Sequence, residues 1–362
     1  MKIATTKQMQ ILGVLTDEIR SGRYAPLAAF PSEIALTRRF KVSRTTVTLV
    51  MKELENRGLV SRAQGRGTFI TKHAASRKIG LIVPGVAYSE FFSSLVSEIS
   101  RLAQKEDRTL LFGDISSKNP EIRVSQAKKF AASIVREGVA GVLYQPLEFV
   151  SDTEKCNREI VTIFTDAGIP VVLIDCDIVK PPKRSGYDLV GINNESAGWR
   201  LAELMIAKGA KNIHFLMHSD RSPNMKKRVN GVMAAVMAHW KNPVRWTGDH
   251  VIDASPDDVE TIRRHIRKHR PDAIICGTDI TAAILKRTLE VIGVKVPKEI
   301  KLAGVDDTKA AIIMTPQLTT IHQPCGRIAE TAFYRLLRRI ENPALPPMEF
   351  LMDAELVERA ST

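Results

Sequence analysis

Apolar residues near the start of the chain recur at helical spacing in two segments that each begin with a serine. Ser32 suits the cap of a helix that runs to about Phe40, because its side-chain oxygen accepts a free backbone N–H of the first turn. Ser43 precedes a second helical repeat, formed by Val47, Val50, Met51 and Leu54. A hairpin is predicted next, where two apolar stretches flank Gly65-Arg66-Gly67. This order of elements predicts a winged helix-turn-helix.

Beyond residue 77 the apolar residues gather in runs of strand length. They occupy residues 78–83, 109–112, 139–144, 170–174, 189–192, 212–217, 273–276, 301–305 and 318–321. Amphipathic helix patterns separate most of these runs, for example at 92–105, 197–208 and 280–291. Apolar strands alternating with helices predict parallel sheets that are covered on both faces. These strands are too many for one compact unit, and we therefore expect an α/β fold with two lobes.

These patterns divide the chain into a small head and a large two-lobed domain. We expect the head at residues 1–71, a polar linker at 72–77 and the two-lobed domain at 78–362. The first lobe is predicted to hold residues 78–187 and 320–345, and the second lobe residues 188–317 and the C-terminal segment.

The polar residues of the head suit DNA. Arg44, Thr45 and Thr46 fill the first turn of the second helix, the element that enters a major groove in helix-turn-helix proteins. Arginine pairs with a guanine edge, and threonine reaches a base or a thymine methyl. The simpler alternative, a capped helix with a solvated basic face, fits any one arginine but not the ordered set with Arg38, Gly65 and Arg66.

Charge is concentrated in the same region. Residues 1–77 hold 14 Lys and Arg against 5 Asp and Glu, a net charge of +9, whereas the whole chain carries +13. A positive charge at one end indicates a nucleic-acid-binding module. It would also suit an anionic membrane surface, but the caps and the hairpin favour DNA.

Polar residues that follow the predicted strands form a candidate ligand site, since ligands bind beyond the carboxyl ends of parallel strands. Carboxylates, an arginine and aromatic rings together suit the hydroxyls of a sugar. An aspartate after a strand is also a common turn or cap residue, so each has a structural alternative. The candidates are Phe91, Phe92, Asp114, Asp175, Asp177, Arg228, Asp279, Asp307 and Gln323, with Asp306 beside Asp307.

Two resemblances sharpen these expectations. Residues 6–71 resemble the DNA-binding domain of GntR-type bacterial transcriptional regulators through Pro31-Ser32-Glu33, the stretch Val42–Val47, Leu54–Leu59 and Gly65–Phe69. The resemblance implies DNA contacts by Arg44, Thr45 and Thr46 and a minor-groove approach at Gly65. Ile34 and Thr48 stand where the best-studied branch has arginines that contact DNA.

Residues 78–362 resemble the effector-binding region of Lac-repressor-type regulators, which share the periplasmic sugar-binding fold. The matching stretches include Ile79–Pro84, Gly168–Asp175, Arg228–Gly231, Gly304–Asp307 and Pro316–Pro324. The resemblance implies ligand contacts by Arg228 and Asp279, with help from Phe91 and Phe92. Cys176-Asp177 and Gly277-Thr278-Asp279 depart from the usual sequences. A GntR-type head on such a domain resembles the arabinose-responsive repressors.

Other site types fit less well. His265 and His269 have metal-ligand spacing on one helix face, but the surrounding cations favour a solvated basic face over a metal site. No phosphate loop, nucleophile elbow or imine lysine stands out, so we expect neither a cofactor nor catalysis. Four scattered cysteines, the absence of a long apolar run and an N-terminus without a secretory h-region predict a cytoplasmic chain without a membrane span.

The sequence therefore predicts a bacterial transcriptional regulator, a repressor of carbohydrate utilisation. We expect a homodimer that binds double-stranded operator DNA and a small effector, a monosaccharide or sugar phosphate, between the lobes. A solute-binding protein for transport or sensing would explain the large domain alone. A sugar-acting enzyme with a DNA-binding head would need an acid–base pair or a nucleophile, and none is evident.

Overall fold

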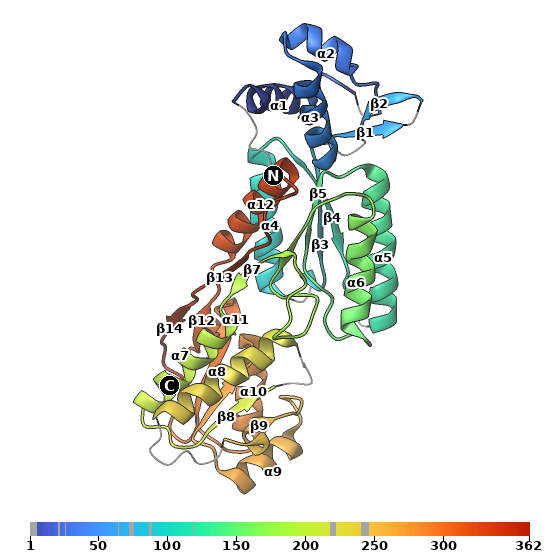
Figure 1. Cartoon of the computed structure of the whole chain (residues 1–362). Coiled ribbons are helices and arrows are strands. Elements are labelled where there is room, and N and C mark those ends of the chain that lie inside the picture. The colour runs from blue at the N-terminus through green and yellow to red at the C-terminus, as the bar shows by residue number, and fades with distance from the viewer. Residues whose placement is uncertain are drawn as a thin grey trace.

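The computed structural model describes residues 6–20, 22–25, 27–63, 65–71, 76–86, 89–117, 119–217, 222–239 and 246–362. Figure 1 shows three parts in a row, with the head next to the first lobe and the second lobe at the opposite end. No helix in these ranges is long and apolar enough to span a membrane.

The head is a winged helix-turn-helix, as predicted. Helices α1 (Thr6–Arg20), α2 (Glu33–Phe40) and α3 (Arg44–Asn56) precede the antiparallel hairpin of β1 (Val60–Ala63) and β2 (Gly67–Ile70). Ser32 and Ser43 cap α2 and α3, and each side-chain oxygen accepts a backbone N–H three residues on. The apolar repeat of α3 is buried in the core of the head, so the opposite face of the helix is free for a partner.

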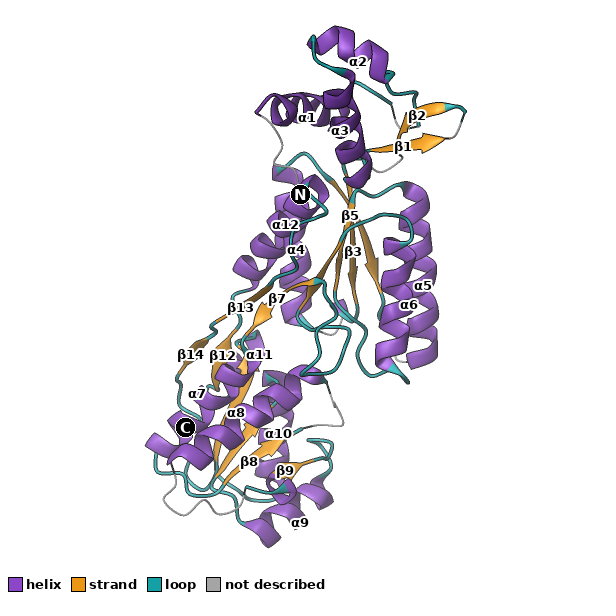
Figure 2. Cartoon of the chain, in the orientation of Figure 1, coloured by secondary structure: helices purple, strands orange, loops and turns teal. Residues whose placement is uncertain are grey.

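The first lobe is a six-stranded sheet in the order β13-β7-β6-β5-β3-β4, with parallel pairing throughout. Its strands are β3 (Lys78–Val83), β4 (Thr109–Asp114), β5 (Gly141–Tyr144), β6 (Val171–Ile174), β7 (Asp188–Ile192) and β13 (Glu349–Met352). Helices α4 (Glu90–Lys105) and α12 (Cys325–Glu341) pack together against the sheet, and α5 (Pro120–Glu137) and α6 (Thr153–Thr165) form a second pair (Figure 2).

The second lobe repeats this plan in the order β14-β12-β11-β10-β8-β9. Its strands are β8 (Ile213–Leu216), β9 (Val251–Ile252), β10 (Ala273–Cys276), β11 (Lys301–Asp306), β12 (Thr319–His322) and β14 (Glu355–Val357). Only β14 runs antiparallel among the paired strands described in this lobe. The helices are α7 (Asn194–Ala207), α8 (Pro223–His239), α9 (Val259–His269), α10 (Asp279–Val291) and α11 (Lys309–Ile313), with the short 3-10 turn η2 (Gly248–His250).

The predicted lobe boundaries were wrong in detail. Strand β7 belongs to the first sheet, although residues 188–192 were assigned to the second lobe, and β12 belongs to the second sheet although 320–322 were assigned to the first. The chain crosses between the sheets after β7, after β12 and between β13 and β14. Crossings after complete strands keep each run of backbone hydrogen bonds in one sheet.

A buried ion cluster fixes the returning helix α12 to the first lobe. Asp188, at the start of β7, forms salt bridges with Arg335 at 2.8 Å and Arg339 at 2.7 Å. The backbone N–H of Met348 donates to the same carboxylate at 2.8 Å. The Asp188 side chain is fully buried, so these donors replace the water that it gives up.

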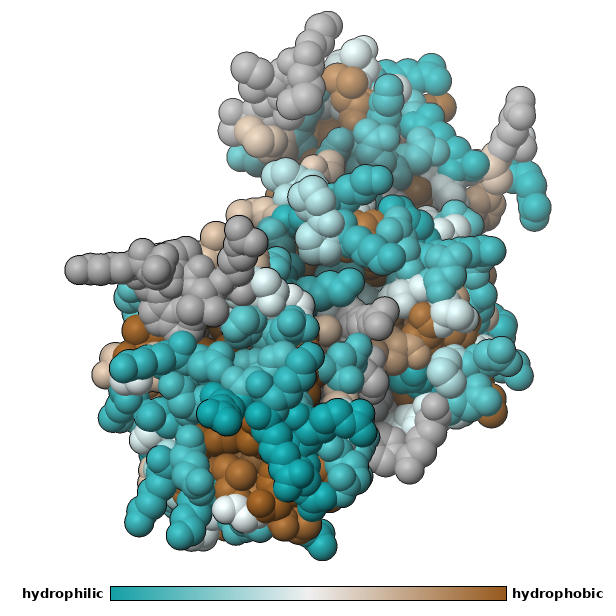
Figure 3. Space-filling model, turned by 90° about the horizontal axis from the view of Figure 1, so that it is seen from below, coloured by the Kyte–Doolittle hydropathy of each residue, from teal (hydrophilic) through white to brown (hydrophobic). Residues whose placement is uncertain are grey.

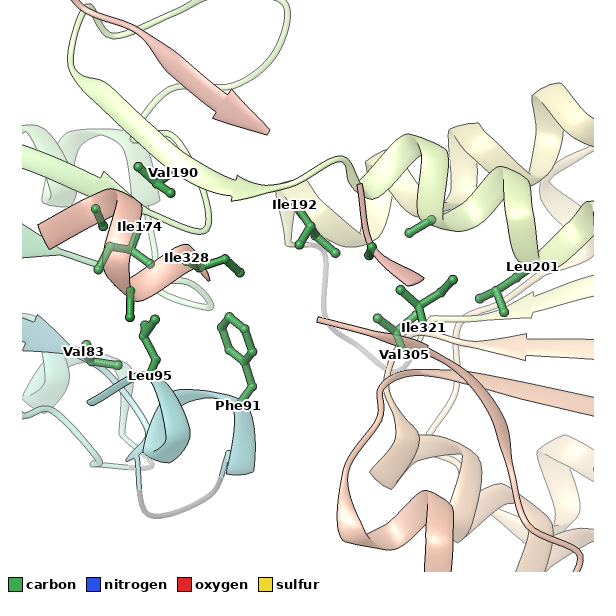
Figure 4. Packing of buried hydrophobic residues seen from close by; sticks show 14 of the residues in the cluster. Val83, Phe91, Leu95, Ile174, Val190, Ile192, Leu201, Val305, Ile321 and Ile328 are labelled. Carbon is green, nitrogen blue, oxygen red and sulfur yellow. The ribbon is translucent and has the colours of Figure 1, made fainter. Parts of the chain in front are cut away.

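The main apolar core extends through both lobes. Figure 4 shows Val83, Leu95 and Ile174 in the first lobe and Leu201, Val305 and Ile321 in the second. Phe91 of α4 stands at the end of the first-lobe group, on the side that faces the second lobe (Figure 4). The apolar core therefore includes residues from both sides of the chain crossings between the lobes.

Candidate functional site

The first turn of α3 presents polar side chains to solvent. The Arg44 side chain is 78% exposed, and Thr45 is exposed beside it. Ser43 accepts the backbone N–H of Thr46 at 3.2 Å, and the two hydroxyl oxygens lie 2.9 Å apart. Arg44 and Thr45 are therefore positioned by a capped, rigid helix start, as a base-reading element requires.

Glu33 connects this helix start to the wing. Its carboxylate accepts a hydrogen bond from Thr48 at 2.9 Å and from Arg62 at 3.3 Å, and it lies 3.9 Å from Nε of Arg44. In the sequence, Glu33 stands out only as part of the Pro31-Ser32-Glu33 motif. Its position indicates that it orients Arg62, because a carboxylate holds a charged donor in a fixed direction.

The other predicted DNA-binding residues differ in how free they are. Arg38 and Arg66 are exposed, and Gly65 at the tip of the wing has a φ of 72°, which glycine adopts without strain. The Ser32 hydroxyl is used in capping α2. Arg39 forms a salt bridge with Glu18 of α1, so it holds the head together.

A pocket of about 160 Å³ lies where the two lobes meet. Five predicted ligand-binding residues line it: Phe91 and Phe92 from α4, Asp175 after β6, Arg228 from α8 and Gln323 after β12. Residues from both lobes therefore surround one space. Its volume is below the roughly 300–1,000 Å³ of drug-sized sites, which suits a small ligand.

Arg228 is held rigidly under this pocket. Only 4% of the residue is exposed. Its Nε donates to Oδ1 of Asn194 at 2.7 Å, and its Nη1 donates to the carbonyl oxygen of Gly277 at 2.5 Å. Neither bond uses Nη2, which leaves part of the guanidinium for a ligand. Asn194 was not predicted; it begins α7, and no sequence spacing connects it to Arg228.

Glycines allow α7 and α8 to approach closely enough for the bond between Asn194 and Arg228. A Cβ on Gly231 would stand 2.8 Å from the backbone nitrogen of Trp199, and one on Gly198 would stand 2.8 Å from the carbonyl carbon of Arg228. Since real Cβ atoms essentially never come within 3.0 Å of such atoms, both positions require glycine.

Aspartates with strained backbones gather at the strand ends. Asp175 has a φ of 71°, and Asp306, which also lines the pocket, has a φ of 117°. Such strain concentrates at functional sites, where the surrounding structure holds it in place. Burial raises the pKa of the Asp306 carboxyl to about 7, against the opposing effect of Arg228. Burial also raises the pKa of Asp175.

Two amide side chains in the pocket have acceptors without a partner in the described part of the structure. They are Oδ1 of Asn224 and Oε1 of Gln323, both buried. Nδ2 of Asn224 donates across the lobes to the carbonyl oxygen of Asp175 at 3.3 Å, and Nε2 of Gln323 donates to Asp306 at 2.6 Å. A buried acceptor without a partner is costly, and both oxygens belong to side chains that line the pocket.

Comparison with known proteins agrees with the two-part architecture. Residues 7–70 match the model of bacterial regulatory proteins of the gntR family, and residues 202–362 match that of a periplasmic binding protein-like domain. The chain joins a GntR-type DNA-binding head to a periplasmic-binding-protein-like domain. It is therefore built as a ligand-modulated transcriptional regulator.

One relative with an assigned function matches almost the whole chain, and another matches about four fifths of it. The arabinose metabolism transcriptional repressor of Geobacillus stearothermophilus is 23% identical over 370 residues, which cover 98% of this chain and 97% of that protein. The repressor PurR of Escherichia coli is 26% identical over 289 residues, covering 79% of this chain and 80% of PurR. Both of these relatives are transcriptional regulators.

Solved structures share the fold. The transcriptional regulator CelR in complex with cellobiose has a TM-score of 0.67 at 18% identity, covering 89% of this chain and 92% of CelR. The lac repressor dimer bound to operator and an anti-inducer has a TM-score of 0.64 at 19% identity, covering 79% of this chain and 94% of that chain.

Several predicted effector residues of this regulator lie away from the pocket. Asp279 is fully buried behind Thr278; it accepts hydrogen bonds from Thr320 at 2.5 Å and from the backbone N–H of Thr308 at 2.8 Å. Burial raises its pKa to about 6. Asp279 thus supports the pocket from behind, through the backbone that carries Thr278.

Asp177 and Asp307 are also bound by protein groups. Asp177 accepts the backbone N–H of Val179 and of Ser185, each at 3.2 Å. Asp307 forms a 2.6 Å salt bridge with Arg359. The side chain of Asp114 lies outside the described residues. The strand-end rule points to the ends of the strands around the pocket, but it does not say which carboxylates line that pocket.

The sequence predicts that His265 and His269 of α9 lie on a solvated face, but both are partly buried. His265 and His269 pack with the buried His214 and with His250 on the second lobe, and His265 lies 2.9 Å from Nδ1 of His214. Burial lowers the pKa of His214 to about 3 and that of His265 to about 4. Among the described residues, no group has the geometry of a metal site.

Proposed function

We propose that this chain is a transcriptional repressor of carbohydrate utilisation whose affinity for operator DNA depends on a sugar bound between its lobes. The observation that carries the proposal is the interlobe pocket, which is lined by Phe91 of one lobe and Arg228 of the other. The protein would bind double-stranded DNA in the bacterial cytoplasm, without a cofactor and without catalysis.

The head supplies the DNA contacts. Arg44 and Thr45 enter the major groove from the start of α3 and read base edges, while Arg38 and Arg66 contact phosphates. Their exposure supports these roles. Arg62 already forms salt bridges with Glu33 and Glu55, so it contributes less to DNA binding.

A second copy of the chain completes the DNA-binding unit. Large apolar side chains are exposed on adjacent helices of the second lobe: Ile280 and Ile284 on α10, and Ile312 and Ile313 on α11, where Ile313 is 80% exposed. Figure 3 shows hydrophobic residues reaching the surface of the second lobe between hydrophilic ones. A two-fold dimer would cover such a patch and present two heads to a pseudo-palindromic operator.

Ligand binding changes the regulator by stabilising one arrangement of the lobes. Two hydrogen bonds already cross between them, from Asn224 to Asp175 at 3.3 Å and from the backbone N–H of Lys309 to Glu90 at 3.0 Å. A sugar that touches both lobes binds the closed arrangement better than the open one and shifts the equilibrium. The segment at residues 72–77 would pass the shift to the spacing of the paired heads.

The test is a thermal-shift screen of sugars, followed by gel shifts on genomic DNA fragments with and without each sugar that binds. The proposal predicts a stabilising sugar that changes the retention of a specific fragment. A sugar-binding protein without specific DNA binding would instead be a solute-binding protein. Turnover of the bound sugar would indicate an enzyme, and either outcome rejects the proposal.

The dimer has its own test. Ile284→Asp places a charge in the exposed apolar patch and should turn a sedimenting dimer into a monomer with weaker operator binding. Exposed Val14 on α1 is a matched site outside the patch, and Val14→Asp should leave the dimer intact. A parent protein that sediments as a monomer, both free and on DNA, would remove the dimer from the account.

A further inference from the structure

Helix α9 of the second lobe has two faces of different chemistry. Ile262 and Ile266 pack into the core of the lobe. Arg264, Arg267 and Lys268 are exposed to solvent. Because residues three and four positions apart lie side by side on a helix, these three cations form one row on the outer face of α9.

Three more exposed cations lie at the same end of the lobe. They are Lys211, Arg270 and Lys298, which precede β8, β10 and β11. These strands pair in parallel, so their starts share one edge of the sheet. The backbone N–H of Lys211 donates to Asp272 at 2.7 Å, and the side-chain amide of Asn212 donates to the carbonyl oxygen of Arg270 at 3.2 Å. We call this surface the basic tip: Lys211, Arg264, Arg267, Lys268, Arg270 and Lys298.

The basic tip concentrates the positive charge of the large domain. Residues 259–272, which are α9 and the turn before β10, hold five Lys and Arg against two Asp and Glu, a net charge of +3. Residues 78–362 carry a net charge of only +4, the difference between +13 for the chain and +9 for residues 1–77. In the described part of the structure no cation of the basic tip forms a salt bridge, whereas the neighbouring Arg263 is paired with Glu260.

Stabilisation of α9 does not account for the whole basic tip. Cations in the last turn of a helix interact favourably with its dipole, and this covers Arg267 and Lys268. Arg264 lies almost a turn earlier, and Lys211 and Lys298 belong to other segments. Like charges on one surface repel one another, so gathering them does not stabilise the fold. The cluster instead suits the binding of a polyanion.

The basic tip lies at the far end of the molecule from the head. In Figure 1, α9 is at the end of the second lobe that points away from the first lobe and the head. The interlobe pocket lies at the ends of the strands and the basic tip at their starts, so the two are on opposite sides of the second lobe. Figure 3 views the molecule from this end and shows strongly hydrophilic residues on it. A partner can therefore bind the basic tip while the head holds DNA.

Duplex DNA is the polyanion that fits this position. It carries one negative charge per about 1.7 Å of its axis, so one segment reaches several cations of the basic tip. Three of these cations are arginines, which pair with a phosphate through two parallel hydrogen bonds. A regulator held on the chromosome by its head also meets DNA at a high effective concentration. An anionic membrane fits less well, since Ile262 and Ile266 pack into the core and leave no large apolar side chain of α9 to insert.

We propose that the basic tip binds the phosphate backbone of a second DNA segment, without reading its sequence, while the head occupies the operator. One regulator then bridges two stretches of the chromosome. The proposal rests on the DNA-binding function of the head. It does not depend on the effector, because the pocket lies on the other side of the second lobe.

The test uses the full-length protein loaded with one equivalent of the genomic fragment that it retains in gel shifts. A short fluorescent duplex of unrelated sequence is then titrated in, and its anisotropy is measured at several salt concentrations. We expect the loaded protein to bind this second duplex, and to bind it more weakly as salt rises, since each phosphate contact releases a counterion. A loaded protein that takes up no second duplex overturns this inference and leaves the regulator standing. A protein that retains no fragment at all overturns the proposed function as well.

A triple variant assigns the second duplex to the basic tip. Arg264→Gln, Arg267→Gln and Lys268→Gln together remove three charges from the outer face of α9. If each side chain contacts a phosphate, affinity for the second duplex falls about tenfold or more, and the salt slope decreases by roughly two to three. Affinity for the first fragment stays the same. Unchanged affinity for the second duplex in this variant contradicts the proposal.

A matched variant controls for the loss of charge alone. Lys129→Gln, Lys155→Gln and Lys183→Gln together remove three exposed cations from the first lobe, and they should alter binding of neither duplex. Unfolding temperatures verify that both triple variants are folded. Titrations with polyglutamate and with phosphatidylserine vesicles test the other polyanions. If the parent protein binds either of these through the basic tip and takes up no second duplex, the partner is an acidic protein or a membrane and the proposal is overturned.

Discussion

Gly231→Ala tests whether the close approach of α7 and α8 sets the position of Arg228. In an open helix position, replacing glycine with alanine is favourable by up to about 1 kcal/mol. Here the added Cβ would come within 2.8 Å of the Trp199 nitrogen, and closer still to the carbonyl oxygen of Glu195. Neither backbone atom can yield without moving a helix, and overpacking of this kind costs about 1–3 kcal/mol.

The net loss of up to about 2 kcal/mol lowers the unfolding temperature by roughly 2–4 °C for each kcal/mol. Separation of the helices also weakens the 2.7 Å bond between Arg228 and Asn194. Hydrogen bonds to charged groups contribute about 1.5–3 kcal/mol, so affinity for the effector should fall about tenfold or more. Differential scanning calorimetry, with and without the sugar found by screening, measures both effects.

Gly326→Ala is the control, because a Cβ at that position of α12 meets no atom within 4 Å. It should leave the unfolding temperature unchanged or raise it. If Gly231→Ala unfolds at the parent temperature or above and binds the sugar normally, the packing of α7 on α8 does not set the pocket.

Three further predictions follow from other contacts. Arg44→Ala should weaken binding to the specific operator by about 1–3 kcal/mol, whereas Arg66→Ala should weaken binding to all DNA sequences alike and reduce the salt dependence of the affinity by about one unit of slope. Fluorescence anisotropy on operator and unrelated DNA separates the two effects. If Arg44→Ala binds the operator as tightly as the parent protein, α3 is not the recognition helix. Asp188→Ala should lower the free energy of urea unfolding by about 3–5 kcal/mol, since it leaves the buried Arg335 and the partly buried Arg339 of α12 without their carboxylate. A loss below about 1 kcal/mol would contradict the stabilising role of this ion cluster. The pKa of His214 in the folded state, about 3, lies below the unfolded value of roughly 6.5. Between these two pH values the unfolded state binds more protons than the folded state. The free energy of unfolding should therefore fall as the pH drops below about 6.5. In pH-dependent calorimetry His214→Gln should flatten that slope, and an equal slope would contradict the assignment.

Most of the fold could be predicted from the sequence because its strands are continuous apolar runs. All nine predicted runs became strands at the expected places. The strands that were missed, β9, β13 and β14, have two to four residues each and lie at sheet edges. The apolar residues of β13 follow Glu349 and those of β14 follow Glu355, and in each strand they form a run of at most three residues, which is too short to indicate a strand.

The site was less predictable because the role of a carboxylate depends on which way its side chain points, and the sequence does not show this. Asp279 and Asp306 both end or follow a strand of the second lobe, yet Asp279 turns toward Thr308 and Thr320 while Asp306 lines the pocket. Asn224 gave no signal because an amide near a helix start usually serves as a cap. Contacts that join distant segments, such as Asn194 with Arg228, become visible only in three dimensions.

The central claim is that the pocket and the head are coupled. Fluorescence anisotropy of a labelled operator, titrated with and without saturating sugar, gives the change in DNA affinity, and calorimetry of the sugar, with and without operator, gives the reverse. The account predicts that both affinities change by the same factor, as linkage requires, and that Gly231→Ala needs more sugar for the same effect. The account is contradicted if the operator affinity is the same with and without sugar and the sugar affinity is the same with and without operator.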